Sequence, residues 1–322
     1  MSQNDYIYAV ARIRSKELSL LSGQFISQLM AAKSYDDCLK LLAERGWGNG
    51  VKSADEMLEL ERERTWKLIG DLVDDMSAFN VFLYANDYHN LKAAIKNAVA
   101  QTKQEGIYIT QGTTVDYRLI ESAVEKKDFG LLPEGMRKAG AQAMKTLLHT
   151  GDGQLCDLIV DKAALTAILA AGKASGNSIL SLYAELMAVS SDIKIAVRAA
   201  KTGKDVNFLK MAVAECTTID ADSLINAAAQ GIDEIYAYLE NTSYSGAVKE
   251  LKISPSAFER WCDNTLMEKI RPELYHAFTI GPLAAYILAR ENEIKTVRII
   301  LSGKLNSLPE DAVAERVREM YV

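Results

Sequence analysis

The segment ENEIKTVRIILSGK, residues 291–304, decides how the rest of the chain is interpreted, because two earlier segments resemble it. These are NDYHNLKAAIK at 86–96 and DIKIAVRAAKTGK at 192–204. Successive copies lie about 100 residues apart, which is too long a period for a short solenoid repeat and is a usual size for a repeated domain. The echo indicates that one helical unit occurs three times along the chain.

Placed in register, each copy has a polar residue, then an aliphatic residue, then a base. The three sets are Asn90, Leu91 and Lys92; Asp192, Ile193 and Lys194; and Thr296, Val297 and Arg298. The middle copy departs most from the others, since Val189 stands where the first and third copies have Asp87 and Glu293.

A pair of short helices is predicted before each copy. The pairs are expected at residues 23–42, 116–132 and 221–239. Each has an acid near the start of its second helix, where the helix dipole stabilises negative charge. These acids are Asp36, Asp128 and Asp233.

The composition fits an all-α protein of several units. A chain of 322 residues exceeds the roughly 250 to 300 residues that one hydrophobic core usually serves. With 49% apolar residues and only 5 prolines, long uninterrupted helices are expected. We predict three helical units, at residues 1–105, 106–204 and 205–322.

Local signals also place the ends of several helices. Ser53, with Glu56 three residues later, forms a capping box, and Ser254 opens another helix. Gly151 should end the helix that begins near Pro133. Residues 172–177 are expected to form a loop or helix break, and IYIT at 107–110 is the one segment with strand character.

Charge and hydropathy exclude two classes of function. The formal net charge of −6 provides no broad basic surface, which a protein with nucleic acid as its main partner would need. The longest nearly uncharged segment, at 277–289, is shorter than the about 20 residues of a membrane-spanning helix. The cysteines lie far apart and are expected to be small buried residues in a reducing compartment; they are Cys38, Cys156, Cys216 and Cys262.

No catalytic, cofactor or metal motif occurs. His89, His149 and His276 are scattered without ligand spacing. The segment 169–178 resembles a phosphate-binding loop, but Ala167 replaces its first glycine and the final hydroxyl residue is missing. The sequence therefore gives no argument for catalysis, a cofactor or a metal site.

Three segments carry a family resemblance: FLYANDYHNLKAAIK at 82–96, GPLAAYILARENEIKTVRIILSGK at 281–304 and LPEDAVAERVREMYV at 308–322. They resemble the central-stalk C subunits of prokaryotic V-type and A-type ATPases, which are the counterparts of the d subunit of the eukaryotic vacuolar proton pump. The segment 5–22 also fits. The pattern G-P-x-x-x-Y-x-L-A-x-E-x-E-I is the most specific part of the likeness.

The resemblance implies a funnel of three similar helical domains around a pseudo-threefold axis, with no active site of its own. It implies a position on the cytoplasmic face of the membrane rotor ring. There the funnel would receive the D and F subunits of the central shaft and transmit torque, for transport of H⁺ or Na⁺ or for ATP synthesis.

Lys92, Lys194 and Arg298 are the candidate partner contacts, because they recur in register on the three echoed helices. The alternative is that they are bases on solvated helix faces. Two other functions stay open at this point, namely a helical-repeat scaffold for an unrelated partner and an enzyme whose site is assembled from distant residues.

Overall fold

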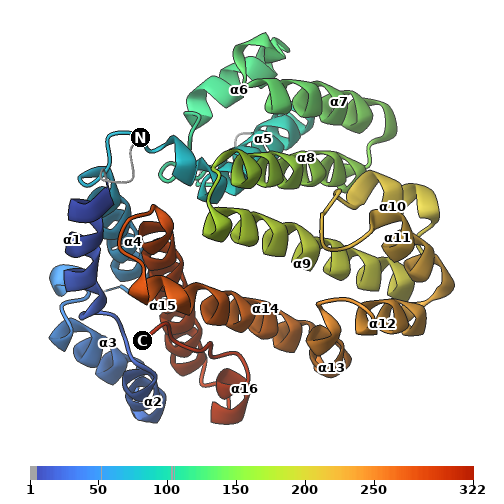
Figure 1. The fold of residues 1–322 in the computed structure, drawn as a ribbon. Coiled ribbons are helices and arrows are strands. Elements are labelled where there is room, and N and C mark those ends of the chain that lie inside the picture. Colours follow the sequence, from blue (N-terminus) through green and yellow to red (C-terminus); the bar gives the residue numbers. More distant parts are fainter. Residues whose placement is uncertain (1–5, 52, 103, 105) are drawn as a thin grey trace. The chain divides into compact units, whose positions relative to one another are not determined.

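The computed structural model describes residues 6–51, 53–102, 104 and 106–322. Helices joined by turns and loops make up this described part (Figure 1). No strand occurs in these ranges, so the all-α prediction is confirmed. The segment 107–110 is not a strand, because Ile109 bonds through its N–H and C=O to the side-chain amide of Asn90. None of the described helices combines the length and apolar character that crossing a bilayer requires.

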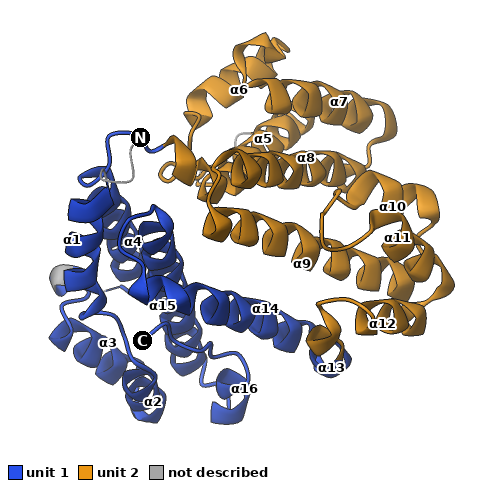
Figure 2. Ribbon diagram, in the orientation of Figure 1, with its two compact units in different colours: residues 1–76, 249–322 blue, residues 77–248 orange. Residues whose placement is uncertain are grey.

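The chain divides into two compact units, residues 1–76 with 249–322 (unit 1) and 77–248 (unit 2) (Figure 2). Unit 1 contains α1 (Ile7–Glu17), α2 (Gly23–Ala31), α3 (Tyr35–Glu44), η2 (Gly48–Gly50), α4 (Ala54–Gly70), α14 (Pro255–Ile270), η5 (Arg271–Tyr275), α15 (Gly281–Leu305) and α16 (Glu310–Ala314). Unit 2 contains η3 (Ser77–Phe82), α5 (Tyr84–Ala100), α6 (Tyr117–Glu125), η4 (Phe129–Leu131), α7 (Glu134–Thr150), α8 (Gly153–Ala174), α9 (Ser178–Thr202), α10 (Val206–Ala212), α11 (Ala221–Gln230) and α12 (Ile232–Glu240). The boundary falls within α13 (Ser245–Ile253). The three-unit division remains a prediction, and residue 105 lies outside the described residues.

The helix ends follow the capping signals. The hydroxyl of Ser53 accepts a hydrogen bond from the N–H of Glu56 at 3.2 Å, and α4 begins there. Ser254 caps α14 in the same way, through the N–H of Ala257 at 3.0 Å. Gly151 ends α7 with a φ of +65°, a left-handed conformation that glycine adopts without strain. The predicted helix ends are thus confirmed, and of the capping box the structure shows the bond from the Glu56 N–H to Ser53.

The three predicted pairs of short elements are present. They are α2 with α3, α6 with η4, and α11 with α12. Asp36 and Asp233 lie in the first turns of α3 and α12, as expected. Asp128 caps η4 by accepting from the N–H of Gly130 at 3.1 Å, although η4 is a single 3₁₀ turn and not a full helix.

The core of unit 1 joins the two ends of the chain. The third echoed helix, α15, packs its apolar face against the first short pair. One buried cluster holds Phe25 and Leu29 of α2, Cys38 and Leu42 of α3, and Ile294, Val297 and Leu301 of α15. Burial of such side chains stabilises by roughly 1.5 to 3 kcal/mol each, so α15 supplies much of the cohesion of the first pair.

In unit 2, the core is built around α5 and α8. Leu91 and Ile95 of α5 lie in a buried cluster with Ile120 of α6, Leu147 of α7 and Val160 of α8. This cluster fixes α5 against the second short pair.

Helix α8 also packs closely on α9 at Gly172, where a Cβ would lie only 2.5 Å from that of Ala184. The helix break predicted over residues 172–177 is shorter in the structure. Helix α8 continues to Ala174, and only residues 175–177 connect it to α9. Glycine is required at residue 172 for helix contact and not for a turn.

The cysteines are free thiols, and Cys38 and Cys156 are fully buried as expected. Cys216 and Cys262 are only partly buried. Burial raises the pKa of the Cys156 thiol to about 11, so it is an unreactive apolar group.

Candidate functional site

The first predicted contact residue, Lys92, lies on α5 and is engaged within unit 2. Its Nζ is 2.7 Å from Oδ1 of Asp161 on α8. The Lys92 side chain is about one quarter exposed, at 25%. Its charge is therefore partly neutralised by Asp161.

The other two predicted residues have different surroundings. Lys194 is half-buried on α9, whereas Arg298 is exposed on α15. Val297 and Leu301 occupy the buried face of α15, so Arg298 points outward. Among the residues that the structure describes, no carboxylate forms an ion pair with Arg298. The three in-register bases thus occupy three environments, and among the described residues Arg298 is the one that combines an exposed position with the absence of an ion pair.

The buried faces of the same helices carry carboxylates that bind backbone. On α5, Asp87 accepts hydrogen bonds from the N–H groups of Thr114 and Val115 at 2.9 and 3.2 Å. The Thr114 hydroxyl donates a third bond at 2.6 Å. These two residues lead directly into α6. Burial raises the pKa of Asp87, while the three hydrogen bonds act in the opposite direction.

Helix α9 holds the third short pair in a similar way. Oε1 of Glu185 accepts from the N–H groups of Thr217 and Thr218, both at 2.7 Å, just before α11. Asp192, farther along α9, accepts from the N–H of Ala214 at 3.0 Å. Burial raises the pKa of Asp192 to about 6.

The third echoed helix repeats the arrangement with the first short pair. Glu293 of α15 accepts a hydrogen bond from the N–H of Leu21, which directly precedes the N-cap of α2. In all three cases, a buried carboxylate on a long helix binds the segment that leads into a short pair. Helix α5 binds the second pair, α9 the third, and α15 the first, so each echoed helix holds the pair that follows it in a cyclic order.

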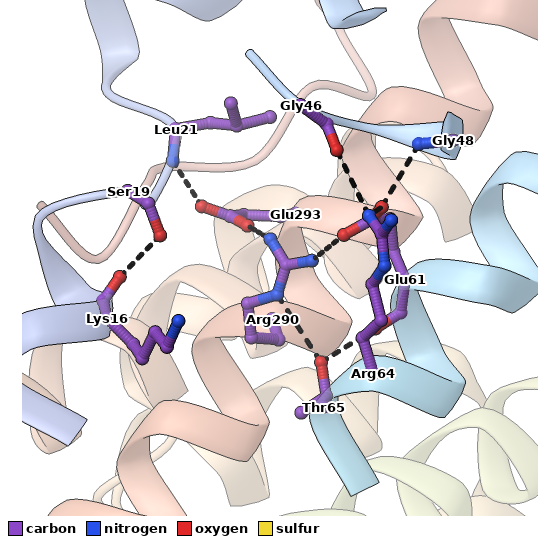
Figure 3. A network of polar contacts seen from close by, with 10 residues as sticks. All are labelled: Lys16, Ser19, Leu21, Gly46, Gly48, Glu61, Arg64, Thr65, Arg290 and Glu293. Atoms are coloured by element: carbon purple, nitrogen blue, oxygen red, sulfur yellow. Dashed lines mark hydrogen bonds and ion pairs between the residues drawn. The ribbon is translucent and has the colours of Figure 1, made fainter. Parts of the chain in front are cut away.

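Glu293 belongs to a buried polar network in unit 1 (Figure 3). The guanidinium of Arg290 lies between two carboxylates, at 2.5 Å from Glu293 and 2.7 Å from Glu61. It also lies 4.9 Å from the centre of the Trp47 ring, within the range of a cation–π contact. Glu61 accepts from the N–H of Gly48 at 3.2 Å. The network therefore ties α15 to α4, η2 and the segment before α2.

Two arginines and two glutamates carry the charges of this network. Arg290 is shared by two acids, and Arg64 adds a second cation at 2.5 Å from Glu61 on the more exposed side. Burial raises the pKa of Glu293 to about 7, although Arg290 and the N–H of Leu21 favour the ionised form. The pKa of Tyr286 is raised to about 12 by burial. Each of these charged side chains is held by a partner, so the network fixes α15 against α4 and the segment before α2.

Sequence reasoning missed several of these residues. The in-register alignment pairs Val189 with Asp87 and Glu293 and so does not point to Glu185, because the middle helix carries its acid one turn earlier. A signal was available, since Glu185 and Asp192 are two turns apart and so share a face. Glu61 lies in the run ELERERT, which is typical of a solvated face.

The described residues contain no group of three or more His, Cys, Asp or Glu side chains that could hold a metal ion. The histidines bind locally, as His89 does to the carbonyl of Ile107 at 3.1 Å and His276 to Glu273 at 3.0 Å.

Comparison with known proteins identifies the family. The family model described as "ATP synthase (C/AC39) subunit" matches residues 9–316. The chain is 21% identical to the C subunit of the V-type sodium ATPase of Enterococcus hirae, over 96% of this chain and 97% of the relative. It is 25% identical to the C subunit of the V-type ATP synthase of Thermus thermophilus, over 98% of both chains. The C subunit of the A-type ATP synthase of Methanocaldococcus jannaschii is 25% identical, over 95% of this chain and 84% of the relative.

The match extends over nearly the whole chain and includes the three echoed helices α5, α9 and α15. The family resemblance of the sequence is thus confirmed. The chain belongs to the ATP synthase (C/AC39) subunit family, and it is a subunit of a V-type or A-type rotary ATPase.

Proposed function

We propose that this chain is the central-stalk subunit that links the rotating shaft of the ATPase to its membrane rotor ring and transmits torque between them. The family match over residues 9–316 carries the proposal. The partners would be the D and F subunits of the central shaft on one side and the ring subunits on the other. The three helical units would form a funnel around the shaft tip.

The buried contacts of the echoed helices support a mechanical role. A torque adapter must resist deformation, and close-packed interiors deform little. The Glu293 contact with Leu21 fastens the first short pair to α15, so the N-terminal part of unit 1 cannot separate without breaking a buried hydrogen bond. Asp87 and Glu185 fasten the other two pairs in the same way.

Arg298 is the strongest of the three proposed partner contacts. An interface that must assemble reversibly uses complementary charge at its rim, and an exposed, unpaired base is suited to this. Lys194 and Lys92 remain proposed contacts, but Lys92 would first have to release Asp161. A partner carboxylate could replace Asp161 at little net cost, since such part-exposed pairs contribute about 0 to 1 kcal/mol.

The proposed location is the cytoplasmic face of the membrane, where the chain would be held peripherally by the complex. One relative is named as part of a sodium ATPase, which is said of that protein. Whether this complex moves H⁺ or Na⁺ is decided by side chains of the ring and not by this chain.

Affinity purification from native membranes tests the proposal. The tagged chain, extracted with a mild detergent, should recover the catalytic, shaft and ring subunits of the ATPase in fixed proportion. Recovery of an unrelated soluble partner without any of them would overturn the proposal and favour a helical-repeat scaffold. Purified alone, the chain should not hydrolyse ATP; turnover that persists through further purification would favour an enzyme.

A further inference from the structure

Unit 2 contains a groove of about 860 Å³, which is lined mainly by residues of α7 and α8. Tyr84 and Tyr88 of α5 and Met211 of α10 also line it. The volume is within the range of about 300 to 1,000 Å³ that is usual for binding sites.

The wall that α8 contributes is a stripe of small apolar residues. Ala163, Ala167, Ala170 and Ala174 follow Ile159 at helical spacing and line the groove. The residues from 159 to 174 span about 22 Å of helix at 1.5 Å per residue. The opposite face of α8 is already packed on α9 through Gly172. This elongated wall of short side chains would let another helix approach closely, at an axial distance of about 8 to 10 Å.

A buried polar group points into the groove. Tyr88 is only 3% exposed and its hydroxyl lies against Gly135 of α7, where a Cβ would come within 2.8 Å of it. Among the described residues, the Tyr88 hydroxyl has no hydrogen-bond partner. Burial raises its pKa to about 12, so it is neutral and can donate a hydrogen bond. The residue is buried as a whole, but its hydroxyl reaches the groove, so a ligand there could accept a hydrogen bond from it.

The charges that line the groove are positive in balance. Lys138 of α7 and Lys162 of α8 both line the groove. Lys162 donates to a backbone carbonyl, that of Lys210, and so keeps its net charge. Lys138 pairs with Glu134 at 3.0 Å, but both side chains are more than three quarters exposed, and such pairs exchange easily. The only acid in the lining, Asp87, is occupied by Thr114 and Val115.

We propose that this groove binds an acidic amphipathic helix of a partner protein, with small apolar residues on its buried face and carboxylates along both margins. The apolar face would lie on the alanine stripe of α8. Carboxylates on the two margins would pair with Lys138 and Lys162, and a polar side chain or carbonyl would accept from Tyr88. A helix fits this arrangement because the alanine stripe of α8 offers a row of short side chains at helical spacing.

The test uses the full chain and a fluorescein-labelled helical peptide of about 18 residues, long enough to cover the groove at 1.5 Å per residue. The peptide carries Ala and Leu on one face and Glu on both margins. We expect saturable binding by fluorescence anisotropy, with a Kd in the range of about 1 to 100 μM. A matched peptide with Lys in place of Glu should bind at least about tenfold more weakly.

Variants of the chain place the binding in the groove. Ala170→Trp fills the groove and Lys162→Glu reverses a wall charge, and each should weaken binding of the Glu peptide by about tenfold or more. The matched changes Ala141→Trp and Lys145→Glu lie at exposed positions of α7 that do not line the groove, and they should bind as the parent does. Thermal unfolding by circular dichroism confirms that each variant is folded.

Four outcomes would overturn the proposal. They are no saturable binding of the Glu peptide, equal binding of both peptides, binding that Ala170→Trp leaves unchanged, and a groove that takes a different occupant. Sedimentation of the parent as a dimer that Ala170→Trp dissociates would assign the groove to a second copy of this chain. Binding of dodecanoate but not of the peptide, lost in Ala170→Trp, would assign it to an anionic amphiphile.

Discussion

The carboxylate of Glu293 accepts a hydrogen bond from the backbone N–H of Leu21, although the two residues lie near opposite ends of the chain. The contact is buried, with Glu293 3% and Leu21 2% exposed. It fixes the start of α2 on α15 and repeats the contacts of Asp87 and Glu185 in unit 2. The cyclic order of these contacts explains why the first short pair depends on the last long helix.

Removal of this carboxylate should destabilise the fold strongly. Glu293→Ala leaves Arg290 with one buried acid fewer and leaves the N–H of Leu21 without a partner, so we expect a loss of about 3 kcal/mol or more in the free energy of unfolding. Urea denaturation followed by circular dichroism measures this. Glu291→Ala on the same helix removes a partly exposed partner of Arg62 and should cost less than about 1 kcal/mol. Equal losses in the two variants would show that the buried contact has no special weight.

Asp192 should make stability depend on pH. The folded state raises its pKa from 3.8 to about 6, so its contribution to stability is fully present below pH 3.8 and is lost as pH rises through 6. Asp192→Asn keeps an acceptor for the N–H of Ala214 and places in α9 the amide that Asn90 supplies in α5. The variant should therefore gain on the order of 2 kcal/mol over the parent between about pH 4 and pH 7, then keep a constant difference.

Urea denaturation at a series of pH values checks this prediction. The exposed Asp222→Asn on α11 is the control and should follow the parent at every pH. A difference between Asp192→Asn and the parent that does not change across this range would mean that Asp192 titrates as an ordinary solvated acid.

Gly172 should tolerate no side chain. A Cβ there would lie 2.5 Å from Cβ of Ala184 and 3.0 Å from the carbonyl oxygen of Leu180, so Gly172→Ala must push α8 away from α9. We expect a loss of about 1 to 3 kcal/mol in thermal or urea unfolding, despite the higher helix propensity of alanine. Gly153→Ala on the same helix meets nothing within 4 Å and should be neutral or slightly stabilising. Similar results for the two changes would be inconsistent with close packing at Gly172.

Charge reversal at Arg298 should weaken assembly and leave folding intact. Because Arg298 is exposed and unpaired in the described structure, Arg298→Glu is expected to change unfolding by less than about 0.5 kcal/mol. If it contacts a partner, the same change should lower the amount of complex recovered from membranes and uncouple ATP hydrolysis from ion transport. ATPase activity of the isolated head should not change. Lys269→Glu on α14, also exposed, is the matched control. Identical recovery of the complex for both variants would mean that Arg298 contacts solvent and not a partner.

The local structure was predictable because its signals are local. Ser53, Gly151 and Ser254 determine helix ends through hydrogen bonds and φ angles that involve neighbours within a few residues. The family resemblance and the in-register echo are likewise visible in the order of residues along the chain and require no tertiary contact. These features can therefore be predicted without knowledge of tertiary contacts.

The pairing of the elements could not be predicted in the same way. Nothing in residues near Leu21 shows that its N–H will bond to Glu293, since the contact depends on how distant segments pack. The same is true of Arg290, whose charge is compatible with a solvated face until Glu61 and Glu293 are placed around it. Glu185 lies one helical turn before Val189, the residue that aligns with Asp87 and Glu293, so an alignment without gaps does not pair it with these acids.

The most direct test of the central claim is ATP-driven ion transport in membrane vesicles prepared with and without this chain. Gradients of both H⁺ and Na⁺ are followed, together with ATP hydrolysis by the detached head. The account predicts that loss of the chain abolishes ion transport while the head still hydrolyses ATP, and that adding back the purified chain restores transport. Transport that proceeds undiminished in vesicles without the chain would contradict its role as the link between shaft and ring.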